Sequence, residues 1–382
     1  MRILIGLTYY RPHYSGLTIY TERLAIALAK RGHEVTVLTS RFSPDLKSEE
    51  ICDGVRVVRL PTLFRISKGV IMPLMPLIGA KLIRKADIVN WHAPQFDAFY
   101  LALLSRIFKK PSVLTYHCDL LLPKGFIHRI ANQVSYHAND ISARTVDCIV
   151  TNTQDFAETS SFLRRYLSKT RVIVPPVELS PATDEDVTSF KKAHNIQPGE
   201  KIIGIGARLA TEKGVEYLIE AMPLILKRYP NARVLHMGPY KNILGEEQYS
   251  RRLEPLIQAL GDRWTFMGIL SPSEKTAFFR SCDVSVLPSI NSTESFGIVQ
   301  IESMLCGTPV VASNLPGVRT PVQSTGYGRI VEPRDPIGLA EAILAILDNP
   351  EQYAVDPVGV ERQYSPDAVA SAYEMLFSEL IH

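Results

Sequence analysis

The chain has 382 residues, of which 46% are hydrophobic and 21% are charged. This composition is typical of a globular protein, and the length suggests two or three domains. The sequence has no apolar run long enough for a transmembrane helix. The net charge of +3 is unevenly divided: residues 1–178 carry 24 Lys and Arg against 14 Asp and Glu (+10), whereas residues 179–382 carry 18 against 25 (−7). We therefore expect the first half to meet an anionic partner, with chance drift of surface charge as the alternative.

Strands and helices alternate along the first half of the chain. The apolar run at residues 2–7 is too short for a signal peptide and suits a first strand. Residues 18–32 have helical periodicity and end at a glycine, Gly32. Further apolar runs predict strands at residues 33–40, 55–61, 86–92, 111–117 and 146–152.

The second half repeats this alternation after a boundary at about residues 175–200, where proline and polar residues gather. Its predicted strands cover residues 201–207, 232–238, 263–268, 282–289, 308–313 and 328–333, with a helix over residues 214–230. Continuous apolar strands separated by helices indicate parallel sheets that are covered on both faces. Two such series predict an α/β protein of two doubly wound domains, and an amphipathic helix over residues 365–382 ends the chain.

No metal site is expected from the cysteines or from the acidic residues. Cys52, Cys118, Cys148, Cys282 and Cys306 lack the spacing of disulfide frameworks or metal ligands, which indicates reduced thiols in a cytoplasmic protein. The acidic residues 184–186 are interpreted as charge at the start of a helix.

Candidate ligand-binding residues follow the predicted strands, where open parallel sheets bind their ligands. Gly16 precedes a predicted helix, and a glycine there allows a phosphate to approach the helix start. Arg208 and Lys213 follow the first strand of the second half, so one loop can bring a guanidinium and an ammonium to a diphosphate. His117 ends a strand and can contact a ligand or exchange protons, although an ordinary structural histidine is equally expected.

Two glutamates, Glu294 and Glu302, flank the sequence Phe296-Gly297. If a helix starts at this Phe-Gly pair, Glu294 stays in the loop and Glu302 lies on the helix. A nucleotide diphosphate sugar fits this arrangement, because Glu294 can accept hydrogen bonds from the sugar and Glu302 from the ribose. The N–H groups at the helix start can face the diphosphate between them.

The motif E-x7-E with Phe-Gly inside resembles the large retaining family of GT-B glycosyltransferases. It is preceded by Arg-x4-Lys-Gly and followed by GTPVVASNLPGV. The resemblance implies two Rossmann-like domains that face each other across a cleft. The first, residues 1–178, would bind the acceptor, and the second, residues 179–360, would bind the donor. Residues 361–382 would form a helix that crosses back to the first domain.

The resemblance also implies residue roles. Glu294 would contact the donor sugar, Glu302 the ribose, Arg208 and Lys213 the diphosphate, and His117 the sugar near its reacting carbon. Backbone contacts to the donor would come from Gly16, Phe296, Gly297 and Ile298, and the base would lie near Pro239, Ile269 and Leu270. The first loop departs from the family pattern, because it reads Ser15-Gly16 where the family usually has Gly-Gly.

The predicted activity is retaining transfer of a hexosyl unit from a nucleotide diphosphate sugar, with a UDP-sugar favoured over GDP-mannose. We expect no metal ion or other cofactor, because Arg208 and Lys213 can stabilise the leaving diphosphate. Front-face attack is favoured over a nucleophilic carboxylate, since Glu294 is the only candidate carboxylate near the sugar and the resemblance assigns it to hydroxyl binding. The alternatives are a GT-B nucleotide-sugar epimerase, transfer to a soluble small molecule, and a sugar-nucleotide-binding protein without activity.

A lipid or lipid-linked glycan is the predicted acceptor. Residues 64–85 and 120–129 combine apolar residues with cations and suit contact with an anionic membrane surface. Pro73 and Pro76 are expected to interrupt any helix in the first of these segments. The protein would then be cytoplasmic, at the inner face of the cell membrane, with no nucleic-acid partner. The alternative is that both segments are packed loops.

Overall fold

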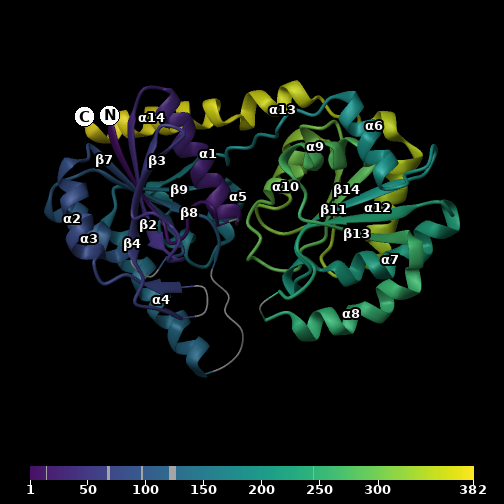
Figure 1. Cartoon of the computed structure of the whole chain (residues 1–382), viewed down its shortest axis with the longest axis horizontal. Coiled ribbons are helices and arrows are strands. Elements are labelled where there is room, and N and C mark those ends of the chain that lie inside the picture. Colours follow the sequence, from purple (N-terminus) through teal and green to yellow (C-terminus); the bar gives the residue numbers. More distant parts are fainter. Residues whose placement is uncertain (14, 67–68, 96–97, 120–125, 244) are drawn as a thin grey trace. The chain divides into compact units, whose positions relative to one another are not determined.

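The computed structural model describes residues 1–13, 15–66, 69–95, 98–119, 126–243 and 245–382. Contacts between Cα atoms divide them into two compact units. Unit 1 comprises Met1–Pro176 and Gln363–His382, and unit 2 comprises Val177–Arg362. Each unit is a sheet with helices on both faces, so the predicted α/β class is confirmed (Figure 1).

The sheet of unit 1 has eight strands in the order β10-β9-β8-β7-β1-β2-β4-β3. In chain order they are β1 (Arg2–Gly6), β2 (Glu34–Arg41), β3 (Glu49–Cys52), β4 (Val55–Pro61), β7 (Ile88–Ala93), β8 (Ser112–Tyr116), β9 (Cys148–Thr151) and β10 (Thr170–Val172). All neighbouring strands are parallel, except that β3, which was not among the predicted strands, pairs antiparallel with β4. The reason is a two-residue hairpin at Asp53 and Gly54, whose φ angles of 50° and 80° suit a tight antiparallel turn.

A second antiparallel pair, β5 (Phe64–Ile66) and β6 (Gly69–Ile71), lies outside this sheet. The helices of unit 1 are α1 (Gly16–Lys30), α2 (Met75–Lys85), α3 (Ala98–Ile107), α4 (Phe126–Thr145), α5 (Gln154–Thr159) and α14 (Pro366–Ile381).

The helix α2 contradicts the expectation that Pro73 and Pro76 interrupt any helix within residues 64–85. It starts at Met75, and Pro76 lies in its first turn, where the missing N–H costs no hydrogen bond.

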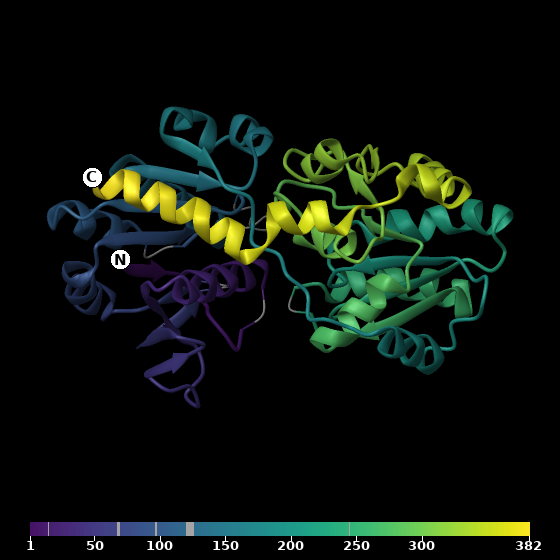
Figure 2. The same ribbon diagram turned by 90° about the horizontal axis from the view of Figure 1, so that it is seen from above.

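The C-terminal helix α14 packs in the core of unit 1. Tyr373 and Phe377 of α14 are fully buried in one apolar cluster with α1 residues such as Leu24. Figure 2 shows α14 running over the strands of unit 1 beside α1. The last helix of the chain therefore completes the fold of its first half.

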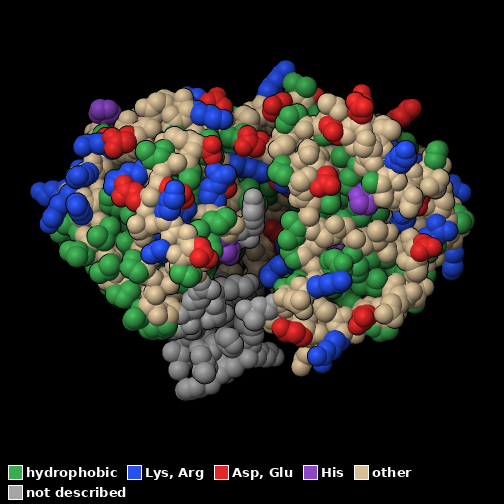
Figure 3. Space-filling model, in the orientation of Figure 1, with side chains coloured by type: hydrophobic (Ala, Val, Ile, Leu, Met, Phe, Trp, Pro, Cys, Tyr) green, Lys and Arg blue, Asp and Glu red, His purple; other side chains and the backbone are tan. Residues whose placement is uncertain are grey.

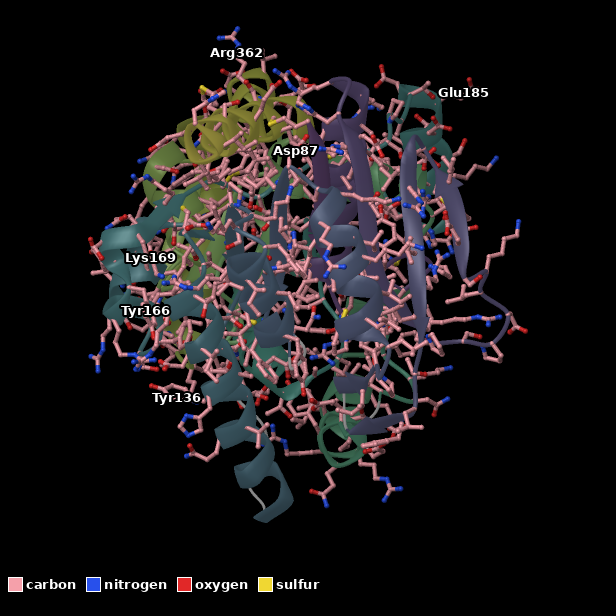
Figure 4. The ribbon with its side chains drawn as sticks, turned by 90° about the vertical axis from the view of Figure 1, so that its left-hand side faces the viewer. Asp87, Tyr136, Tyr166, Lys169, Glu185 and Arg362 are labelled. Carbon is pink, nitrogen blue, oxygen red and sulfur yellow. The ribbon has the colours of Figure 1, made fainter. Side chains whose placement is uncertain are left out.

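The helix α4 is anchored through the carboxylate of Asp140. This group accepts hydrogen bonds from the hydroxyl of Tyr166 at 2.6 Å and from the guanidinium of Arg165 at 2.7 Å. Lys169 donates to the carbonyl of Val146 at 2.8 Å, just after the helix end. Figure 4 shows Tyr166 and Lys169 close together on this side of unit 1. These contacts fix the C-terminal end of α4 against the chain that follows α5.

The sheet of unit 2 has six parallel strands in the order β13-β12-β11-β14-β15-β16. They are β11 (Ile202–Gly206), β12 (Arg233–Met237), β13 (Trp264–Gly268), β14 (Val284–Leu287), β15 (Val310–Ser313) and β16 (Gly328–Val331). The helices are α6 (Asp184–Ala193), α7 (Val215–Arg228), α8 (Glu247–Leu260), α9 (Pro272–Arg280), α10 (Ile298–Met304), α11 (Thr320–Thr325) and α12 (Pro336–Asp348), and α13 (Pro357–Tyr364) crosses into unit 1. The acidic residues 184–186 form the first turn of α6, as expected for helix-start charge.

Both sheets reverse their strand order at one point, and such switch points are where doubly wound sheets bind ligands. In unit 2 the order reverses between β11 and β14, and in unit 1 between β1 and β7. The loops at the carboxyl ends of these strands are therefore the first place to look for a site.

Candidate active site

The switch point of unit 2 brings together the loops that follow β11 and β14. These two strands pair in parallel, with Ile203 opposite Val284. Arg208 and Lys213 lie in the first loop, and Lys213 ends a short 3-10 turn. Glu294 lies in the second loop, and α10 starts after Gly297, so the predicted separation of Glu294 (loop) and Glu302 (helix) is observed.

A glycine allows the two loops to approach closely. Gly214 has a φ of +61°, and a Cβ added to it would lie 2.2 Å from the carbonyl oxygen of Pro288 in the second loop. The N–H of Ile290 donates to the carbonyl of Glu212 at 3.0 Å. Only glycine fits at residue 214, and this close approach places Lys213 beside the loop that carries Glu294.

Each predicted diphosphate-binding cation is paired with a carboxylate. Lys213 Nζ lies 2.5 Å from Glu294 Oε2, and the guanidinium of Arg208 pairs with the carboxylate of Glu212. The four side chains are between 17% and 34% exposed, so solvent and an anionic ligand can reach them. The site combines two cations, which suit phosphates, with two carboxylates, which suit hydroxyl groups.

Glu302 is nearly buried and has a cationic partner that the sequence did not reveal. Its carboxylate Oε1 lies 2.7 Å from Nζ of Lys275, and its side chain is 8% exposed. Lys275 lies in α9, which starts after β13, whereas Glu302 lies in α10, which follows β14. The ion pair therefore orients the carboxylate for which the sequence predicts a ribose-binding role.

The turn between Glu294 and Glu302 is fixed from within. Gly297 has a φ of +78°, and an added Cβ would lie 2.3 Å from the Leu287 side chain. The fully buried amide of Gln300 donates to the carbonyls of Phe296 at 2.7 Å and Val318 at 2.9 Å. The Phe296 ring is buried, so only the backbone of Phe296 can make the predicted contact with a ligand.

The residues expected near the base lie at the same edge of the sheet. Pro239 and Ile269 follow β12 and β13, and the N–H of Gly238 donates to the carbonyl of Gly268 at 2.8 Å. The carbonyl of Pro239 accepts from the N–H of Leu209 at 2.8 Å, next to Arg208. Ile269 is 82% exposed, whereas Leu270 packs partly against the core of unit 2.

The remaining predicted site residues, Gly16 and His117, belong to unit 1. Gly16 is the first residue of α1, and an added Cβ would meet no atom within 4 Å, so the protein's own packing does not require a glycine there. His117 directly follows β8, and its N–H donates to the carbonyl of Ala93 at 3.0 Å. Burial lowers the pKa of His117 to about 3, so its imidazole is neutral at physiological pH.

Two family models match consecutive parts of the chain. The model described as Glycosyltransferase Family 4 matches residues 14–180, and the model described as Glycosyl transferases group 1 matches residues 186–355. Together they cover most of both α/β units. The chain belongs to the GT-B glycosyltransferases.

Curated relatives and solved structures are similar to this glycosyltransferase over almost its whole length. An uncharacterized glycosyltransferase from Methanocaldococcus jannaschii is 29% identical, over 91% of this chain and 90% of the relative. The phosphatidyl-myo-inositol mannosyltransferase of Mycobacterium leprae is 25% identical over 97% of this chain and 95% of its own. The structure of Anabaena HepE in complex with UDP superposes with a TM-score of 0.78 at 21% identity and covers all of both chains, which shows the shared fold.

Sequence reasoning located the main candidate residues of this GT-B glycosyltransferase but missed their partners. Glu212, Lys275 and Gln300 hold Arg208, Glu302 and the Phe296-Gly297 turn, respectively. Gln300 lies between the two glutamates of the motif, so its place on α10 could have been inferred. Nothing in the sequence indicated that Lys275, on another helix, reaches Glu302.

Proposed function

We propose that this glycosyltransferase moves a hexosyl unit, with retention, from a nucleotide diphosphate sugar to a lipid or lipid-linked glycan. The observation that carries this proposal is the contact of 2.5 Å between Lys213 and Glu294. It holds a cation suited to phosphate against a carboxylate suited to sugar hydroxyls, at the switch point of unit 2. The diphosphate would bind beside Arg208 and Lys213, the sugar beside Glu294 and the ribose beside Glu302.

Stabilisation of the leaving group would drive the reaction. When the bond between the anomeric carbon and the phosphate oxygen breaks, negative charge grows on the diphosphate. Arg208 and Lys213 would stabilise this charge without a metal ion or other cofactor, aided by the N–H groups where the seven-residue helix α10 begins. As the donor binds, Arg208 and Lys213 would turn from Glu212 and Glu294 to the phosphates, and Glu294 would accept hydrogen bonds from the sugar hydroxyls.

Retention would follow from attack on the face that the diphosphate leaves. The acceptor oxygen forms a bond to the anomeric carbon on that same face, and its proton passes to a phosphate oxygen of the leaving group. A double displacement would need a free carboxylate nucleophile. Glu294 is the candidate carboxylate beside the sugar, and its proposed role there is to bind hydroxyl groups.

We expect UDP to be the preferred nucleotide, since the similar Anabaena HepE was solved in complex with UDP. UDP, GDP and ADP should each be compared in thermal unfolding, where the cognate nucleotide raises Tm by mass action. Incubation of the UDP-sugar with a lipid extract should then give a glycosylated lipid with retained anomeric configuration. An epimerised donor without acceptor would instead support the epimerase alternative, and transfer only to water-soluble acceptors would exclude a lipid.

A membrane acceptor is supported by an exposed apolar and cationic surface on unit 1. We call it the α2–α3 surface, and it comprises Leu74, Leu77, Lys81, Arg84, Lys85, Leu103, Arg106 and Ile107. Leu77 and Ile107 are 70% and 68% exposed, and Figure 3 shows hydrophobic side chains gathered where α2 and α3 lie. A glycine brings the two helices together, since a Cβ on Gly79 would lie 2.7 Å from the Leu101 side chain.

Only part of the segments predicted to touch a membrane contributes to this surface. Within residues 64–85, Val70, Met72 and Met75 are core residues, as the alternative of packed loops requires. Lys68 and residues 120–125 lie outside the described residues. In the described parts of the chain, no helix is long and apolar enough to cross a membrane. The M. leprae relative is named for a phosphatidylinositol acceptor, which fits an enzyme that works at a lipid surface.

Replacing Lys81, Arg84 and Lys85 together by glutamine should release the protein from anionic vesicles in a flotation assay. Each cation near the surface contributes about 1 kcal/mol of attraction at low salt. The matched control replaces the exposed Lys191, Lys192 and Lys227 of unit 2 and removes the same charge. If the wild-type protein ignores anionic vesicles, or both triple variants float equally, the acceptor is better sought among soluble molecules.

A further inference from the structure

His117 contacts a second buried histidine. His117 Nε2 lies 2.8 Å from Nδ1 of His92, a fully buried residue of β7, and the two rings stack with centroids 5.1 Å apart. Burial lowers the pKa of both groups, so both imidazoles are neutral at physiological pH. A neutral imidazole has one N–H donor and one acceptor nitrogen. Only one of the two facing nitrogens can therefore carry the proton of this hydrogen bond.

Thr21 indicates that the proton belongs to His92. The Thr21 hydroxyl donates to the carbonyl of Leu17, one turn back in α1, at 2.9 Å. Its oxygen therefore turns a lone pair toward His92 Nδ1, which lies 3.1 Å away. A proton on His92 Nδ1 can be shared between this oxygen and His117 Nε2, whereas a lone pair on Nδ1 would face the lone pair of the Thr21 oxygen without a proton between them.

The contacts of Asn90 with the opposite side of the His92 ring indicate the same tautomer. Its carbonyl oxygen accepts the hydroxyl proton of Thr115 at 2.9 Å. Its amide nitrogen then faces His92 Nε2 at 3.4 Å and can only donate. His92 Nε2 is therefore an acceptor, which places the single ring proton of His92 on Nδ1.

We infer that a buried relay of Asn90, His92 and Thr21 fixes His117 in the tautomer that carries its proton on Nδ1. His92 donates to His117 Nε2, so His117 can use only Nδ1–H as a donor. The inference rests on the proposed function, and the role of His117 at the donor sugar is the one that the family resemblance implies. In that role His117 could not act as a base through Nε2, and any hydrogen bond that it donates would come from Nδ1–H.

The relay reaches the C-terminal helix. The Thr115 hydroxyl donates to Asn90, so the hydroxyl of Tyr373, 3.0 Å away on α14, must donate to Thr115. The hydroxyl of Tyr20, at 2.9 Å, then donates to Tyr373. All of these side chains are at most 1% exposed, so water cannot reorient the chain of donors. α14 thereby takes part in positioning His117 and His92.

Nitrogen NMR of histidine-labelled protein tests the inference directly, because it distinguishes the two tautomers. The wild-type protein should show His117 protonated on Nδ1 and His92 protonated on Nδ1. Protonation of His117 on Nε2 would overturn the inference, and this measurement needs no variant.

Substitutions test the catalytic consequence. His92→Leu should lower kcat roughly tenfold or more, the loss found when a metal-bound histidine loses the partner that orients it, and leave nucleotide affinity unchanged. His92→Gln, which keeps a donor, should recover part of the loss. Thr21→Val should weaken the tautomer preference, whereas Ser105→Ala, which removes another buried hydroxyl bonded one turn back in a helix, should not.

The outcomes separate the inference from the proposed function. If His117 shows the expected tautomer but His117→Ala transfers at the wild-type rate, the relay stands and the role of His117 at the sugar is lost. If His117→Ala lowers kcat and the folded His92→Gln variant recovers nothing, or if Ser105→Ala alters the tautomer as Thr21→Val does, the relay is refuted.

Discussion

Replacing Lys213 or Arg208 by alanine is expected to lower kcat by about 10²–10³-fold, the typical cost of removing one donor that stabilises charge in the transition state. The free energy of unfolding should change by less than about 1 kcal/mol, because the ion pairs of both residues are partly exposed. The diphosphate gains charge only as the glycosidic bond breaks, so these residues should affect turnover more than ground-state binding. Steady-state kinetics and denaturant unfolding of the same preparations measure the two effects.

The chain offers a matched control for this experiment. Lys201 Nζ lies 3.1 Å from Oδ1 of Asp283, with 29% and 31% of the side chains exposed. This ion pair joins the amino ends of β11 and β14, whereas Lys213 and Glu294 join their carboxyl ends. Lys201→Ala should cost similar stability and leave kcat unchanged. Full activity of both Lys213→Ala and Arg208→Ala would refute the diphosphate site.

The parallel core of both units could be predicted from sequence, because buried parallel strands are apolar without alternation. The edge strands β3 and β10 of unit 1 could not be predicted in this way, although the edge strands β13 and β16 of unit 2 were predicted at residues 263–268 and 328–333. β3 begins with two glutamates and has only two apolar residues, so its apolar content gives no strand signal. The Asp53-Gly54 hairpin that makes β3 antiparallel was nevertheless visible as a turn dipeptide.

The candidate site was predictable to the extent that it depends on strand ends. Arg208, Lys213 and Glu294 each follow an apolar strand, and the carboxyl ends of parallel strands share one edge of the sheet. The contact between Lys275 and Glu302 depends on how α9 packs against α10, which no local pattern contains. The relay around His92 is hidden for a related reason: β7 is buried throughout, and its polar Asn90 and His92 find partners on α1 and β8 only after the sheet has formed.

The division of roles between the two glutamates gives the second large effect. Glu302→Gln should weaken nucleotide binding roughly tenfold or more, since a hydrogen bond to a charged group contributes about 1.5–3 kcal/mol. The ribose does not change during the reaction, so the loss should appear in nucleotide Kd and in KM. Glu294→Gln should instead lower kcat and leave nucleotide Kd unchanged, because its proposed partner is the sugar at the reacting centre. Calorimetric titration with the cognate nucleotide and steady-state kinetics separate the two.

A second ion pair, with side chains about as buried as that of Glu302, provides a control for this comparison. Glu200 pairs with Arg233 at 2.9 Å, and both side chains are 10% exposed, close to the 8% of Glu302. Arg233 begins β12, so this pair lies at the opposite edge of the sheet from the candidate site. Glu200→Gln should therefore reduce stability about as much as Glu302→Gln does, without changing nucleotide Kd.

Lys275→Ala should weaken nucleotide binding as Glu302→Gln does, because it removes the cation that orients the Glu302 carboxylate. An unchanged nucleotide Kd in Glu302→Gln would show that the buried carboxylate serves the packing of α9 on α10, and the ribose contact would have to come from elsewhere.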